Sequence, residues 1–61
     1  MIIVTFEIRG IGEIFKIPVS WFKFDPKNMV HRTMYILNVE YTVISVVQYG
    51  NGDMTITLEK L

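Results

Sequence analysis

The 61-residue sequence contains no cysteine and no alanine, and it has a single histidine. Without cysteine there is no disulfide, and one histidine among separated acids does not supply the three or four ligands that zinc requires. A domain of this size buries only about 60% of the surface that its unfolded chain exposes. With disulfides and metals excluded, association is the remaining usual source of stability. We therefore expect no metal, no cofactor and a homo-oligomer, most simply a homodimer.

Net charge and long apolar runs are also missing. Six basic and six acidic residues give a formal net charge of zero, which removes the long-range field of a dedicated nucleic-acid binder. The distribution is uneven, with four basic residues and one acid (+3) in Ile14–Asn38 and one basic residue and three acids (−2) in Val39–Leu61. No apolar run approaches the roughly 20 residues that span a bilayer, and the N-terminus does not read as a signal peptide. These features predict a cytoplasmic protein without membrane contact.

The sequence offers little for catalysis, which needs a nucleophile, a base and an orienting group within reach of one another. Ser20, Asp25 and His31 are close in sequence, but no nucleophile elbow or oxyanion loop accompanies them. Gly10-Ile11-Gly12 lacks the third glycine of a dinucleotide-binding loop, because Phe15 occupies that position. The acids are spread singly, without a pair that predicts acid/base chemistry. We expect no catalytic residues and no enzyme.

Strand is the favoured local structure, because Ile, Val and Thr supply 21 of 61 residues and β-branched side chains pack well on a pleated sheet. Val4, Phe6 and Ile8 alternate with polar residues, as in a half-buried strand. A turn at residues 10–12 leads into a second strand, which completes a hairpin. Pro18 has no N–H for the ladder and therefore predicts a sheet edge or a bulge.

A second hairpin follows from Gly50-Asn51-Gly52, which lies between the apolar stretches Tyr41–Tyr49 and Asp53–Leu61. Its last strand should turn Met54, Ile56 and Leu58 toward the core and leave residues 55, 57 and 59 outside. The facing register of the preceding strand is left open, since a shift of one residue reverses its two faces.

The middle of the chain is ambiguous. Asp25 as N-cap and Pro26 at the first position predict a helix from Pro26 to Asn38, with Asn38 as its C-terminal cap. Its apolar side would hold Met29, Val30, Thr33, Met34, Ile36 and Leu37. The predicted fold class is then α+β, a single domain over residues 1–61 with two hairpins and one helix between them (ββαββ). The alternative treats Thr33–Tyr49 as strand throughout and gives an all-β, five-stranded SH3-like or OB-like barrel.

The candidate binding segment runs from Trp21 to Lys27, where consecutive aromatic residues cannot all point into one core. The simplest arrangement buries Trp21 and Phe24 and leaves Phe22 partly exposed. Exposed aromatics beside basic residues instead mark protein-interface hot spots or platforms that stack nucleobases. The partner-binding residues that we predict are Trp21, Phe22, Lys23, Phe24, Lys27, His31, Arg32 and Tyr35.

The predicted chain has two hairpins, Ile2 to Trp21 and Tyr41 to Leu61, on either side of Asp25-Pro26. In this pattern it resembles the small single-domain inhibitors encoded by bacteriophages, which bind and block a host enzyme or an anti-phage-defence protein. The resemblance implies a protein partner and identifies no target and no residue role. The sequence thus predicts a non-enzymatic protein-protein interaction module, a small inhibitor or adaptor. The alternative is a small nucleic-acid-binding or transcription-regulatory domain that uses the basic aromatic segment from Trp21 to Tyr35.

Overall fold

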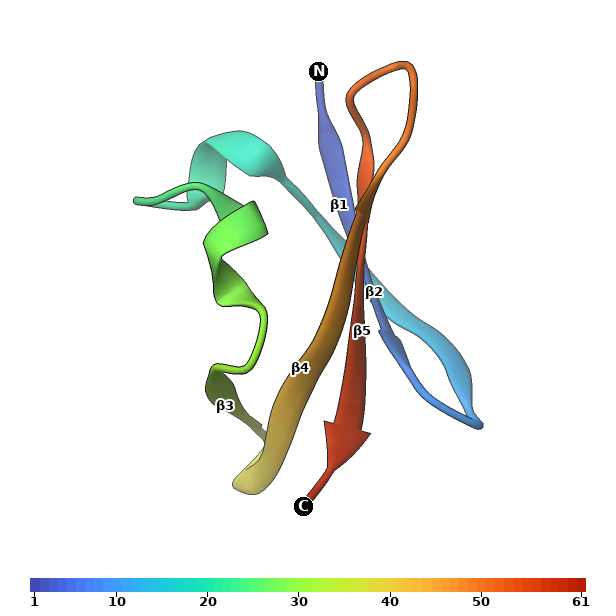
Figure 1. Cartoon of the computed structure of the whole chain (residues 1–61), viewed down its shortest axis with the longest axis vertical. Helices are drawn as coiled ribbons and strands as arrows, with labels where there is room; N and C mark the ends of the chain where they lie inside the picture. The colour runs from blue at the N-terminus through green and yellow to red at the C-terminus, as the bar shows by residue number, and fades with distance from the viewer.

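The computed structural model describes all 61 residues and contains one five-stranded sheet (Figure 1). Two short 3₁₀ turns lie in the segment between the second and third strands. The elements are β1 (Ile3–Ile8), β2 (Gly12–Pro18), η1 (Val19–Trp21), η2 (Pro26–Met29), β3 (Thr33–Ile36), β4 (Val39–Gln48) and β5 (Met54–Lys60).

The strand order in the sheet is β2-β1-β5-β4-β3. The hairpins β1–β2 and β4–β5 are both present, and they meet in the middle of the sheet because β1 and β5 pair in parallel, with Phe6 opposite Ile56. Residues 19–32, which we call the crossover, lead from the edge strand β2 to the edge strand β3. They lie over one face of the curled, half-barrel sheet (Figure 1).

The predicted helix from Pro26 to Asn38 does not form, so the α+β (ββαββ) prediction is wrong. Its start signal does act locally, because Pro26 opens η2 and the Asp25 carboxylate accepts the Lys27 backbone N–H at 3.0 Å. The turn ends at Met29, and Thr33–Ile36 pairs with β4. The β-branched and aromatic residues there satisfy their backbone groups better in a ladder than in an alanine-free helix. The all-β alternative fits, in the form of a half-barrel.

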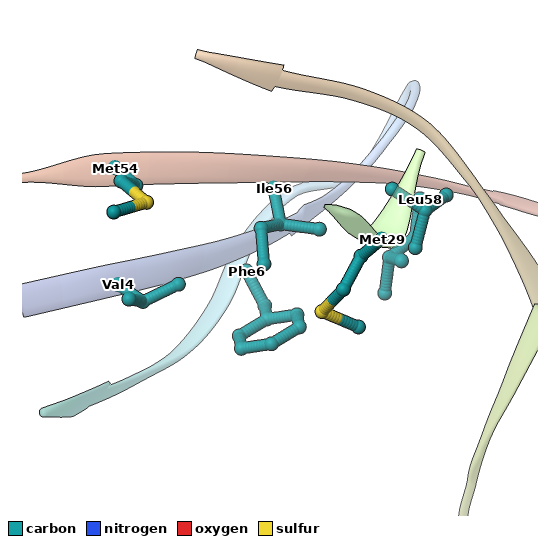
Figure 2. Close-up of a cluster of buried hydrophobic side chains, with 7 residues drawn as sticks. Val4, Phe6, Met29, Met54, Ile56 and Leu58 are labelled. Carbon is teal, nitrogen blue, oxygen red and sulfur yellow. The ribbon is translucent and has the colours of Figure 1, made fainter. Parts of the chain in front are cut away.

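The core lies between the sheet and the crossover. Figure 2 shows side chains from β1 and β5 beside Met29 of η2, and Val43 of β4 completes the buried cluster. Phe6 stacks on Phe15 of β2 at 4.7 Å between ring centroids and on Phe22 of the crossover at 6.2 Å. As predicted, the last strand contributes three of the buried residues, and the whole cluster consists of Val4, Phe6, Met29, Val43, Met54, Ile56 and Leu58.

Pro18 lies in the edge strand β2, as predicted. The Val19 N–H donates to the Ile2 carbonyl at 2.9 Å. Because inward and outward backbone groups alternate along an antiparallel strand, Pro18 occupies an outward position. Its missing N–H therefore leaves the β1–β2 ladder intact and removes a donor from the free edge, which limits pairing with other strands.

No segment covers the opposite face of the sheet, which we call the open face (Figure 1). It is formed by strand side chains that alternate with the core residues, and many of them carry hydroxyls. The Thr57 hydroxyl donates to a Glu7 carboxylate oxygen at 2.8 Å, and the hydroxyls of Tyr49 and Thr55 lie 3.1 Å apart. These polar pairs indicate that the open face is in contact with solvent, as in antiparallel sheets that pack only one face against a core.

Candidate functional site

The aromatic residues of the crossover divide between core and solvent. Phe22 packs face to face on Phe6, whereas Trp21 is 70% exposed and Phe24 is 55% exposed with its ring edge-on to Phe22. The predicted burial of Trp21 and Phe24 is therefore wrong, whereas Phe22 is partly exposed as predicted. The cause is η1, because side chains three residues apart eclipse in a 3₁₀ turn. Phe22 follows Val19 toward the core, and Trp21 points elsewhere.

Basic residues accompany the two exposed rings. Lys23, Lys27 and Arg32 are all exposed, and Asp25 is the only acid of the crossover. Lys27 lies 3.8 Å from the Asp25 carboxylate, and Arg32 is held along η2 by a 3.3 Å hydrogen bond from its Nε to the Asn28 carbonyl. Three bases against one acid leave the crossover with a formal charge of +2.

The structure therefore keeps six of the eight predicted residues exposed on the crossover, among them His31. The two exposed rings and the three basic residues form what we call the crossover surface: Trp21, Lys23, Phe24, Lys27 and Arg32. Phe22 is partly buried and packs against the core instead. His31 is exposed, and its backbone, at a φ of 71°, donates an N–H to the Val43 carbonyl and turns the chain into β3.

Tyr35 lies apart from the crossover surface. The predicted helix would have aligned it with Lys27 and His31, but in the structure it stands on β3 opposite Glu40. Its strand neighbour Met34 packs against the core, so Tyr35 points to the open face and is 68% exposed. The strand geometry thus divides the predicted patch between two sides of the sheet.

Sequence reasoning missed Leu37, which it assigned to the buried side of a helix. Leu37 and Asn38 form the two-residue turn between β3 and β4, both with positive φ (50° and 66°), and Leu37 is 92% exposed. Paired positive φ values are those of a type I′ hairpin turn. Asn38 was the available signal, since Asn enters this conformation more readily than most residues.

The remaining features of the surface are few. There is no pocket, and no group of three His, Cys, Asp or Glu side chains could hold a metal ion. Ser20, Asp25 and His31 form no hydrogen bond with one another, and the Asp25 carboxylate faces Lys27. No helix has the length and apolar character needed to cross a membrane.

Comparisons of the chain with protein-family models, curated proteins and solved structures give no match.

Proposed function

We propose that this protein is a non-enzymatic protein-binding module, an inhibitor or adaptor that docks an acidic segment of a partner protein on the crossover surface. The observation that carries the proposal is the exposure of Trp21 and Phe24 while the partly buried Phe22 between them stacks on the core residue Phe6. Trp, Tyr and Arg are the residues that most often dominate binding energy at protein interfaces.

The arrangement gives each residue a role. Phe22 holds the backbone on the sheet, so the neighbouring rings are presented with little loss of conformational freedom on binding. Trp21 has the larger exposed area; covering roughly 140 Å² of it at about 25 cal/mol per Å² contributes about 3–4 kcal/mol before the costs of association. Lys23, Lys27 and Arg32 give the same crossover an excess of positive charge, which favours an acidic partner.

The phage-inhibitor resemblance and the cytoplasmic location stay part of this proposal. Both are compatible with a small protein that acts by covering a functional surface of another protein. A partner blocked in this way would lose activity because access to its surface is lost, with no chemical change.

The test is capture of a partner by the tagged protein from a lysate of the source organism, followed by binding of the purified partner. The variant W21A/F24A removes both exposed rings and should abolish binding. The matched control is Leu37→Ala, which removes an even more exposed apolar side chain at the β3–β4 turn and should bind normally. Urea unfolding of all three proteins shows whether the fold is retained.

Two results would refute the proposal. In the first, W21A/F24A binds the purified partner as tightly as the unmodified protein. In the second, nuclease treatment removes the captured material and affinity for an oligonucleotide falls steeply with added salt, as phosphate contacts require. That second result would establish the nucleic-acid alternative.

A further inference from the structure

Four of the six acids of the chain, although separated in sequence, gather on the open face. Glu7 and Glu13 are opposite each other across β1 and β2, and the Thr57 hydroxyl from β5 donates to Glu7. Glu59 occupies an outward position on β5. Glu40 is opposite the outward-facing Tyr35 on β3. Alternation along each strand brings them to the same side, away from the core.

Two bases share this face. Arg9 pairs with Glu59 at 3.1 Å, and Lys16 pairs with Glu13 at 3.7 Å. Four acids against two bases leave the open face with a formal charge of −2, equal and opposite to the +2 of the crossover. The uncharged total of the chain therefore conceals two faces of opposite sign, separated by the thickness of the sheet and its core.

Apolar side chains are exposed on both faces as well. Tyr35, Val47 and Tyr49 are exposed on the open face, and Trp21 and Phe24 on the crossover surface. Each face thus offers what the other can cover: apolar area together with the opposite charge. Charge complementarity of this kind steers association and sets its orientation.

We propose that the crossover surface of one copy docks on the open face of a second copy. This inference rests on the proposed function in one respect, since the same crossover surface does the binding. The two faces lie on opposite sides of the sheet (Figure 1), so two copies cannot satisfy both contacts between themselves. The association is head to tail and produces a series of oligomers or a ring, in which the expected homodimer is only the first step.

Self-association has a consequence for binding. A crossover surface covered by another copy is not available to a protein partner, so partner and second copy compete. The contact between exposed charges is also screened by salt, because the Debye length falls from about 30 Å at 0.01 M to about 10 Å at 0.1 M ionic strength. Free, binding-competent monomer should therefore increase with dilution and with salt.

Sedimentation velocity of the full chain over a range of concentration at low and high salt tests the inference with two charge-reversal variants. K23E/R32E reverses the crossover surface, and E13K/E40K reverses the open face. Unmodified protein should form dimers and larger species at low salt. Each variant alone should require about tenfold more protein or more to associate, because like charges then face each other. An equimolar mixture of the two variants should associate again.

The outcomes separate the possible interfaces. If E13K/E40K still dimerises like the unmodified protein, copies meet crossover to crossover and the inference is wrong. If K23E/R32E still dimerises like the unmodified protein, the copies meet open face to open face, and the inference is again wrong. A monomer of 7.1 kDa at every concentration and salt also overturns it. E13K/E40K leaves the crossover surface intact and should still capture the partner if the proposed function holds. Failure of the self-association proposal can therefore be distinguished from failure of the proposed function. Cooperative urea unfolding of each variant confirms that it is folded.

Discussion

The β3–β4 turn should be stabilised by exchanging its two residues for Asn-Gly. Leu37 has a φ of 50°, and a left-handed conformation costs a residue with a β-carbon about 1–2 kcal/mol. Full burial of a leucine side chain contributes about 1.5–3 kcal/mol, and Leu37, at 92% exposure, keeps less than about 0.3 kcal/mol of it. Asn-Gly is the preferred pair for a type I′ hairpin. We expect L37N/N38G to raise the free energy of unfolding by about 1 kcal/mol.

Urea unfolding at equilibrium measures this change as a higher midpoint with an unchanged slope. In thermal unfolding, 1 kcal/mol corresponds to about 4–8 °C for a domain of this size. The control is Leu37→Ala, which keeps the positive φ without glycine or asparagine and should stay within about 0.5 kcal/mol of the original. If L37N/N38G is no more stable than the original chain, Leu37 bears no conformational cost and the reasoning is refuted.

Two further predictions concern stability. Gly52→Ala should lower the free energy of unfolding by about 1–3 kcal/mol, because Gly52 has a φ of 96° and a new Cβ would lie 3.2 Å from an Ile2 methyl. Gly50→Ala is the control, since a Cβ there would meet no atom within 4 Å and the residue has no positive φ. Equal unfolding midpoints for the two variants would contradict the prediction. Phe22→Ala should lower the free energy of unfolding by about 2–4 kcal/mol, because the Phe22 ring stacks on Phe6; this is somewhat below the range for fully buried phenylalanines. Phe24→Ala should lower it by less than about 1 kcal/mol. A larger loss for Phe24→Ala in urea unfolding would reverse our assignment of the two rings.

The candidate site was predictable in part. A run of aromatic residues too dense for one core indicated that some rings must be exposed, and Trp21 and Phe24 are. Which rings they are depended on the 3₁₀ turn that directs Phe22 inward, and no periodicity in the sequence indicates that turn. The acids of the open face were visible only as single residues, because strand pairing across the sheet brings Glu7, Glu13, Glu40 and Glu59 to one side.

The β4–β5 hairpin illustrates the limit of local patterns. Its turn and the inward face of β5 follow from Asn51-Gly52 and from strict alternation. The register of β4 does not, because the register shifts between Val43 and Ser45 and both Val43 and Val46 then face the core. A bulge of this kind inserts one residue and reverses the alternation beyond it, which no periodic pattern in β4 reveals.

By itself, the sequence determined the properties that depend on neighbouring residues: β-rich composition, two hairpins, the edge position of Pro18 and the start of a turn at Asp25-Pro26. The tertiary structure decided those that depend on distant residues. β1 pairs in parallel with β5 some 50 positions away, and the opposite charges of the chain separate onto two faces. No local pattern specifies which strands meet over such a distance. Thr33–Ile36 lies between these two cases: its β-branched and aromatic residues are poor helix formers, and pairing with β4 across the Leu37-Asn38 turn makes it strand.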